Sequence, residues 1–296
     1  MKKNLAADAN PQKKRKKRSR FVSTFLRAFE TPPAKIGGVL LIVIVVLCVF
    51  APLFTKYTPN DMDMAHALAK PSLAHLCGTD NLGRDQWTRL LYGGRYSLAL
   101  GVIGSLFAAI GGTGLGVVAG YFGGQVENLI MRFCDIWTAI PGTLLCIVIS
   151  TALGPGFFNT ILALSLGAIP NGARMTRGQI LAERTKEYLE AAEAMNCSKM
   201  SIMFRHLLPN VISPTIVGTT MGIGATITQA ATLSYIGLGV QPPTPEWGAM
   251  LSAGKNYVTS YPHLLLFPGL AIGLATLAIN LMGDGLRDAL DPKLRK

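Results

Sequence analysis

Long apolar runs alternate with polar connections along most of this chain. A helix rises 1.5 Å per residue, so about twenty apolar residues cross a bilayer core of about 30 Å. Six runs approach or exceed that length, and the pattern therefore predicts six membrane-spanning helices. The runs cover residues 36–54, 96–122, 129–153, 157–175, 211–238 and 264–282.

Lysine and arginine are distributed unevenly among the connections between these runs. Cytoplasmic connections carry the excess of these residues in membrane proteins. With the N-terminus in the cytoplasm, the inner segments hold 21 Lys and Arg and the outer segments hold 6. The pattern therefore predicts that both termini are cytoplasmic. The inner segments are 1–35, 123–128, 174–206 and 283–296, and the outer segments are 55–95, 154–156 and 239–263.

Two connections are long enough to carry structure of their own. In the outer loop 55–95, Trp87, Leu90 and Leu91 follow i, i+3, i+4 spacing, which predicts an amphipathic helix at the membrane interface. In the inner loop 174–206, the stretch 184–195 lacks Gly and Pro and is rich in helix formers. It predicts a short soluble helix between two membrane helices. The chain then divides into a basic tail 1–35, a first span 36–54, the outer loop, a membrane core 96–282 and a C-terminal tail 283–296.

Glycines four residues apart mark the second apolar run. Gly112, Gly116 and Gly120 follow this spacing, which lets membrane helices approach closely. The same run matches G-x-G-x-x-A at Gly114, Gly116 and Ala119. A dinucleotide-binding site needs a preceding strand, and this run is a membrane segment. The glycines are therefore interpreted as helix-packing positions.

Composition and charge support a membrane protein. Charged residues make up 15% of the 296 residues, against about 25% in soluble domains. Hydrophobic residues make up 50%, mean hydropathy is +0.37 and net charge is +12. Eleven Lys and Arg lie in 1–35, directly before an apolar run. The basic tail is therefore interpreted as a cytoplasmic flank of an uncleaved first span beside anionic lipid, and no nucleic-acid partner is expected.

Signatures of catalysis or cofactor binding are missing from the sequence. The five cysteines are scattered and indicate neither a disulfide framework nor a zinc site. The four histidines do not cluster, and no P-loop, H-E-x-x-H or G-x-S-x-G motif occurs. We therefore expect a non-catalytic chain that binds no cofactor or metal. Arg132 and Asp135 are three residues apart in the third run and can pair on one helix face or reach to the interface.

The inner loop carries the most specific pattern. Glu190-Ala191-Ala192 is followed by Asn196, then by nine residues, and then by His206-Leu-Leu208-Pro209. This spacing resembles the EAA motif of ATP-binding-cassette (ABC) importer permeases, EAA-x3-G-x9-I-x-LP. Asn196 replaces the Gly of the motif, and Asn is the next-best residue for a left-handed turn after a helix. His206 stands where the motif has an aliphatic residue.

A wider resemblance to the dipeptide/oligopeptide/nickel branch of these permeases runs from about residue 36 to the C-terminus. The tail 1–35 lies outside it. The chain is similar to the C-type permease subunit of that branch. The matching segments are Gly78–Asp80, Leu82–Asp85, Arg89–Gly93, Ala119–Gly124, Glu187–Ala192, Arg205–Asn210, Ala231–Ser234, Gly237–Pro245, Trp247–Gly248, Phe267–Leu270 and Gly283–Pro292.

The resemblance implies an all-α integral membrane fold, the type I ABC importer permease (MetI-like) fold, with six transmembrane helices and a cytoplasmic coupling helix. It implies a bacterial inner-membrane permease that forms half of a peptide pathway. The implied partners are a second homologous permease, two ABC ATPases that bind ATP and Mg, and an extracytoplasmic substrate-binding protein. Import of nickel or another small chelate by the same architecture is the alternative.

The resemblance also assigns site residues. The coupling helix and its exit would contact an ATPase groove, with small alanines for close approach and a carboxylate for pairing. Polar residues of the fifth span line water or bond to neighbouring helices, and both alternatives stay open. The coupling residues are Glu190, Ala191, Ala192, Ala194, Asn196, Arg205, Leu208 and Pro209, and the pore candidates are Thr219, Thr220, Thr226, Thr228, Gln229, Thr232 and Ser234.

Other classes of protein make different predictions. A self-sufficient secondary carrier transports without an ATPase and tolerates Glu190→Arg. A membrane-anchored enzyme needs a catalytic constellation. A nucleic-acid anchor loses binding when Lys13–Arg20 is removed. The outer segment 237–248, with three prolines and Trp247, and the loop 55–95 are candidates for contact with a binding protein.

Overall fold

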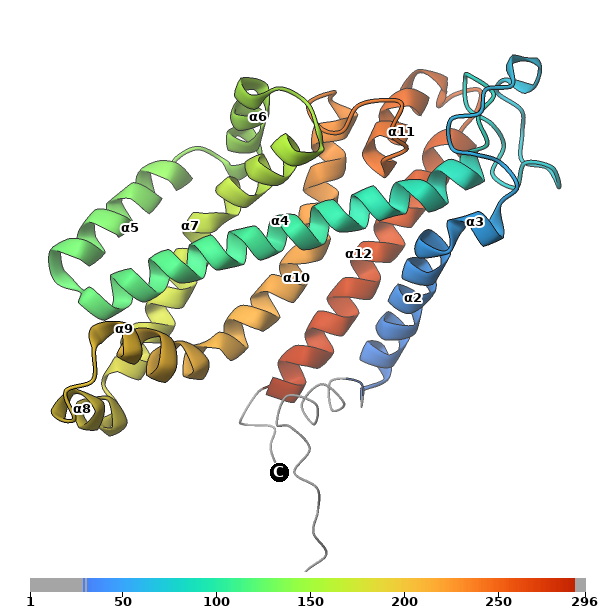
Figure 1. Cartoon of the computed structure of the whole chain (residues 1–296). Helices are drawn as coiled ribbons and strands as arrows, with labels where there is room; N and C mark the ends of the chain where they lie inside the picture. The colour runs from blue at the N-terminus through green and yellow to red at the C-terminus, as the bar shows by residue number, and fades with distance from the viewer. Residues whose placement is uncertain (1–28, 30, 291–296) are drawn as a thin grey trace, which may run out of the picture.

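The computed structural model describes residues 29 and 31–290, and its regular secondary structure is helical, with one isolated bridge between Thr79 and Asp85 (Figure 1). The predictions for 1–28, 30 and 291–296 lie outside the described residues. The helices are α2 (Pro32–Val49), α3 (Ala51–Phe54), η1 (Met64–His66), α4 (Gln86–Phe122), α5 (Gly124–Thr138), α6 (Gly142–Leu153), α7 (Phe157–Arg184), α8 (Glu187–Ala194), α9 (Lys199–Ser201), η2 (Ile202–Leu207), α10 (Leu208–Tyr235), α11 (Trp247–Gly254), η3 (Lys255–Tyr257) and α12 (His263–Leu290).

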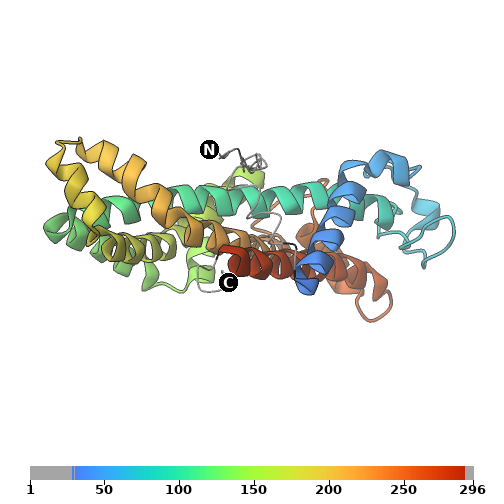
Figure 2. The same ribbon diagram turned by 90° about the horizontal axis from the view of Figure 1, so that it is seen from below.

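Helix α4 crosses the other long helices and packs mainly against α7 (Figure 1). The spaced glycines make this contact possible. A Cβ atom on Gly112 would lie 2.9 Å from the Gly172 Cα, and one on Gly116 would lie 2.6 Å from the Ala173 carbonyl oxygen. The predicted role of these glycines in helix packing is therefore confirmed. Viewed from below, the long helices form an extended, shallow assembly (Figure 2).

Four helices, namely α2, α4, the continuous stretch Lys199–Tyr235 and α12, are long and apolar enough to cross a membrane. The third predicted run, 129–153, is divided between α5 and α6, which meet at 86°. Pro141 lies at this break, where a residue without an N–H cannot continue the helix. Counting the bent pair as one span gives up to five within the described residues. The count of six stays a prediction.

The interfacial helix expected near Trp87 is not a separate element. It forms the first turns of α4, which runs without a break for 37 residues. Thr88 and Arg89, on the face that the amphipathic pattern left polar, are buried. The loop before α4 covers them, because the Arg89 guanidinium donates to the Pro59 carbonyl at 2.7 Å. Asp85 caps the helix by accepting from the Thr88 N–H at 2.7 Å.

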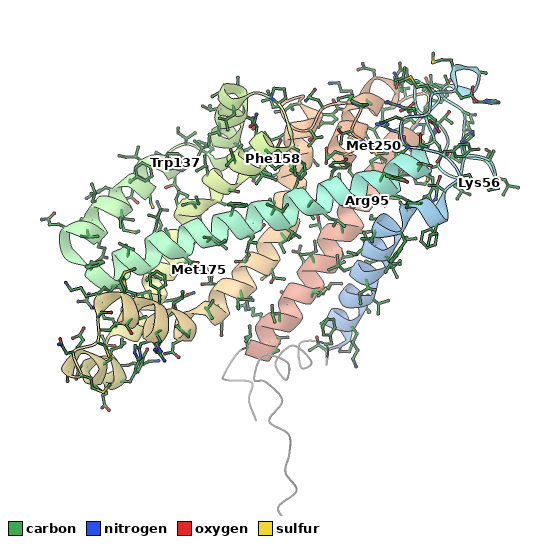
Figure 3. The ribbon with its side chains drawn as sticks, in the orientation of Figure 1. Lys56, Arg95, Trp137, Phe158, Met175 and Met250 are labelled. Carbon is green, nitrogen blue, oxygen red and sulfur yellow. The ribbon has the colours of Figure 1, made fainter. Side chains whose placement is uncertain are left out.

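The connection between α10 and α12 folds onto the same end of α4. Trp247 of α11 is buried, and its indole N–H donates to the Leu90 carbonyl at 2.9 Å. Glu246 is also buried and accepts from the Ser97 hydroxyl at 2.9 Å. Arg95, labelled in Figure 3, donates to the Cys48 carbonyl at the end of α2 at 2.7 Å. The loop before α4 and the connection between α10 and α12 therefore lie at one end of the molecule, and α8 lies at the other (Figure 1).

Candidate functional site

The segment with the EAA pattern forms helix α8. Glu187 and Glu190 lie in its first turn, where carboxylates interact favourably with the positive end of the helix dipole. The helix ends at Ala194, and Asn196, two residues further on, has φ of 55°. The Cys197 N–H donates to the Ala192 carbonyl at 3.1 Å, and the Asn196 N–H donates to the Glu193 carbonyl at 2.9 Å. These two bonds form a Schellman motif, so Asn196 supplies the left-handed turn expected from its place in the sequence.

The two faces of α8 have opposite environments. Leu189 and Ala192 are buried in an apolar cluster that joins α8 to α4, α7, η2 and α10. Glu190, Ala191 and Ala194 are exposed on the other face. One face is thus fixed to the long helices, while the other presents small side chains and a carboxylate. The buried members of the cluster are Val117, Ile180, Leu189, Ala192, Ile202, Met203, Leu207 and Val211.

Hydrogen bonds also attach α8 to the ends of two long helices. The Tyr188 hydroxyl donates to Glu183 at the end of α7 at 3.0 Å and accepts from the Asn210 amide of α10 at 3.0 Å. Partial burial, together with the bond to Glu183, raises the pKa of Tyr188. The Lys186 ammonium lies 2.6 Å from the second oxygen of Glu183. Sequence patterns did not reveal this junction, because Tyr188 and Asn210 are 22 residues apart.

Helix α8 leads into α10 through α9 and a π-helical turn, η2. The Leu208 N–H donates to the Met203 carbonyl five residues earlier. Pro209 follows, and its ring disfavours the usual bond to the carbonyl four residues earlier. The predicted coupling residues Arg205 and Pro209 are exposed here, and Leu208 packs against the apolar cluster. Pro209 is in the first turn of α10, as expected, but α10 continues directly from η2.

The polar residues of α10 fall into three groups. Thr219 and Thr226 face a cavity, and Thr220 faces an apolar groove of about 570 Å³ between α4 and α10. Gln229 lies 3.3 Å from the Cys146 Sγ, and the Thr228 hydroxyl lies 3.5 Å from that of Thr276. The other two residues bond within their own segment. The Thr232 hydroxyl donates to the Thr228 carbonyl, and the buried Ser234 hydroxyl accepts from the Val240 N–H.

The cavity has a volume of about 280 Å³ and lies between α4, α7 and α10. Met175, labelled in Figure 3, is part of its wall. None of its lining residues is charged, and its surface is mainly apolar with a few hydroxyl and amide side chains. Such a surface offers hydrogen bonds to a solute without selecting for net charge. The polar lining includes Ser105, Thr113, Asn171, Thr176, Thr219 and Thr226.

The pairing suggested for Arg132 and Asp135 is not found in the structure. Asp135 pairs instead with Arg174 of α7 at 3.0 Å, because α5 turns this residue toward α7. Glu127 of α5 likewise accepts from the Arg177 Nε of α7 at 2.6 Å. Both ion pairs therefore hold α5 against α7. Within the described part of the chain, no three His, Cys, Asp or Glu side chains are placed to hold a metal ion, and all five cysteines are free thiols.

Several apolar spans, with an exposed helix at one end, define a multi-pass membrane protein. Residues 112–296 match the family model described as the binding-protein-dependent transport system inner membrane component. Residues 19–71 match the N-terminal transmembrane domain of oligopeptide transport permease C, so the likeness extends further into the basic tail than the sequence motifs indicated. The chain belongs to this family of inner-membrane transport components, and it is a multi-pass membrane protein.

Curated relatives match most of the chain. The dipeptide transport system permease protein DppC of Alkalihalophilus pseudofirmus is 41% identical over 88% of this chain and 86% of its own length. The glutathione transport system permease protein GsiD of Escherichia coli O157:H7 is 44% identical over 88% and 87%. The di/tripeptide permease DppC of Pseudomonas aeruginosa is 40% identical over 92% of both.

Solved structures confirm the fold. A chain of the MetNI methionine ABC transporter in an inward-facing conformation matches with a TM-score of 0.56 and 20% sequence identity. The match covers 69% of this chain and 96% of that chain. A second crystal form of the same transporter matches with the same TM-score and 22% identity. The expected type I ABC importer permease fold is therefore confirmed.

Proposed function

We propose that this chain is the non-catalytic transmembrane subunit of an ATP-driven peptide importer and that it receives the motion of an ATPase through α8. The observation that carries the proposal is the two-sided environment of α8. Its exposed face, with Glu190, Ala191 and Ala194, is free to enter a groove on a partner. Its buried face belongs to a cluster shared with α4, α7 and α10. A force applied to the exposed face therefore reaches three long helices.

The proposed complex contains this chain, a second homologous permease, two ATPases and an extracytoplasmic substrate-binding protein. ATP and Mg²⁺ bind to the ATPases. The excess of Lys and Arg in 1–35, 174–206 and 283–296 supports a cytoplasmic location for both termini and for α8. The opposite end, formed by residues 55–85 and 237–262, then faces outward and meets the binding protein.

Peptides are the proposed substrate class. Relatives above 40% identity are named as dipeptide and glutathione permeases, and both kinds of molecule contain peptide bonds. The cavity between α4, α7 and α10 supports this choice, because its uncharged hydroxyl and amide groups suit the donors and acceptors of a peptide backbone. A nickel chelate remains the alternative substrate in the uptake test below.

The test is charge reversal on the exposed face of α8 by Glu190→Arg. In cells that express the whole transporter, we expect uptake of labelled dipeptide to fall by about tenfold or more, because a new cation replaces the carboxylate at the docking face. We also expect the ATPases to be lost from the detergent-purified complex. Asp288→Arg is the matched control, since Asp288 is exposed on α12 outside the docking face.

Two outcomes contradict the proposal. Normal uptake by the Glu190→Arg variant, with no ATPase bound, indicates a self-sufficient carrier. Uptake of labelled nickel, with no uptake of dipeptide or glutathione by the unmodified transporter, shows that the substrate class is wrong.

A further inference from the structure

We propose that Tyr188 is a positioning residue whose hydroxyl joins the ends of α7 and α10, so that displacement of α8 moves both helices together. This inference rests on the function proposed above. It goes further by naming the residues that pass the motion of α8 to the long helices. These residues are Tyr188, Glu183 and Asn210, and none of them is a position of the EAA pattern, which ends at Pro209.

The hydroxyl of Tyr188 makes one bond in each direction. It donates to Glu183 Oε1 in the last turn of α7 at 3.0 Å. It accepts from the Asn210 Nδ2 in the first turn of α10 at 3.0 Å. Tyr188 itself lies in the first turn of α8. One oxygen atom therefore bridges three helices that leave this end of the molecule in different directions (Figure 1).

The neighbouring groups complete the junction. The second oxygen of Glu183 is bound by the Lys186 ammonium at 2.6 Å. The Asn210 Nδ2 has two hydrogens, and it also donates to the His206 carbonyl at 2.8 Å. Glu183 and Asn210, the two partners of the Tyr188 hydroxyl, thus each have a second hydrogen-bond partner. The orientation of each side chain depends on the others, as in a cooperative hydrogen-bond network.

The bond to His206 connects the junction with the π-helical turn. In η2 the backbone N–H bonds reach five residues back, and Pro209 has no N–H to offer. The Asn210 side chain thus supplies a donor to a carbonyl at this irregular point of the helix. Such π-helical turns are frequent at functional sites. Asn210 therefore links the local geometry of the α8–α10 connection to the hydroxyl of Tyr188.

The apolar cluster alone does not fix the ends of α7 and α10 relative to each other. The ring of Tyr188 packs at the edge of the cluster, and that contact can slide as α8 moves. Hydrogen bonds require defined distances and angles, so they transmit direction as well as position. The predicted function of the hydroxyl is therefore to keep the ends of α7 and α10 in register while α8 is displaced.

The experiment compares Tyr188→Phe with the unmodified protein in the complete transporter, reconstituted in lipid vesicles with its ATPases and binding protein. Phe keeps the ring and its packing but removes the hydroxyl. Tyr121→Phe is the matched control: Tyr121 packs against the same cluster, and its hydroxyl has no hydrogen-bond partner among the described residues. The measurements are ATP hydrolysis with and without loaded binding protein, peptide uptake per ATP hydrolysed, and the unfolding temperature.

For Tyr188→Phe, we expect ATPases to stay bound and basal ATP hydrolysis to stay within about twofold. We expect peptide uptake per ATP to fall about fivefold or more, which is the usual range of coupling between distant sites. Tyr121→Phe is expected to leave this ratio unchanged. Asn210→Ala should lower the ratio similarly, and adding it to Tyr188→Phe should cause little further loss, because the two residues act as a unit.

Three outcomes overturn the inference. An unchanged uptake ratio in Tyr188→Phe shows that the hydroxyl does not couple the helices. Equal losses in Tyr188→Phe and Tyr121→Phe, together with a lower unfolding temperature, show a structural role only. A complex of unmodified subunits whose ATP hydrolysis does not respond to loaded binding protein contradicts the proposed function itself, and the inference with it.

Discussion

Single glycines set how closely α4 approaches α7. Gly112, Gly116 and Gly120 each have α7 atoms within 3 Å of the place that a Cβ would occupy. Gly114, on the same helix, has nothing within 4 Å. The four-residue spacing in the sequence predicted which glycines form the contact, because residues four apart share a helix face. The sequence did not specify the partner, which depends on how the chain folds back.

Gly116→Ala is expected to lower the free energy of unfolding by about 1–3 kcal/mol, the usual cost of overpacking a close contact. The new methyl group would lie 2.6 Å from the Ala173 carbonyl oxygen, so one of the two helices must move. Unfolding in mixed detergent micelles by titration with sodium dodecyl sulfate measures the difference.

Gly114→Ala is the matched control on the same helix. We expect no loss of stability, and a gain of up to about 1 kcal/mol from the better helix propensity of alanine. Equal destabilisation by both substitutions would show that α4 and α7 do not pack as the structure has them.

At the scale of elements, local pattern and tertiary packing determine different features. The helix at 187–194 and the turn at Asn196 could be predicted, since composition and left-handed preference act over a few residues. The start of α4 could not, because Thr88 and Arg89 are polar and become buried under a loop 30 residues away. The junction at Tyr188 was missed for the same reason. Asn210, which donates to the Tyr188 hydroxyl, is brought close to it by the path of the whole α8–α10 connection.

The broken run between α5 and α6 depends on Arg174 as well as Pro141. The Arg174 guanidinium donates to Thr138 Oγ1 at 2.6 Å, to Asp135 Oδ1 at 3.0 Å and to the Cys134 carbonyl at 3.3 Å. These acceptors belong to the last turns of α5, where a cation also interacts favourably with the helix dipole. Arg174 therefore fixes the end of α5 before the chain turns into α6.

Arg174→Met is expected to loosen the end of α5 and to lower its local stability by about 1 kcal/mol. The pair with Asp135 is partly exposed, so most of the loss comes from the other hydrogen bonds. Hydrogen exchange at the backbone amides of residues 135–139 should become faster. Arg132→Met is the matched control, since Arg132 is exposed on α5 and makes no ion pair with a described residue. Faster exchange in both variants, or in neither, would contradict this role of Arg174.

At the scale of the whole molecule, the two ends differ in construction. One end is built from loops that fold over the start of α4, and the other is built from α8 and its connections (Figure 1). Charge distribution in the sequence predicts which end is cytoplasmic, because the segment 174–206 at the α8 end holds six Lys and Arg. Transport in the proposed direction requires that α8 faces the ATP supply and that the loops face the binding protein.

Single cysteines placed at the two ends test this orientation. Leu73 in the outer loop is 99% exposed, and Met195 after α8 is 70% exposed. Four natural cysteines are buried, and replacing Cys197 with Ser removes the fifth as background. With a membrane-impermeant maleimide on intact spheroplasts, we expect Leu73→Cys to be labelled and Met195→Cys to be labelled after the membrane is opened. The reverse pattern would put α8 outside, where no ATPase can reach it. That result would refute the coupling role of α8. It would leave the fold unaffected, because the orientation in the membrane is determined by positive charges near the spans and not by the packing of the helices.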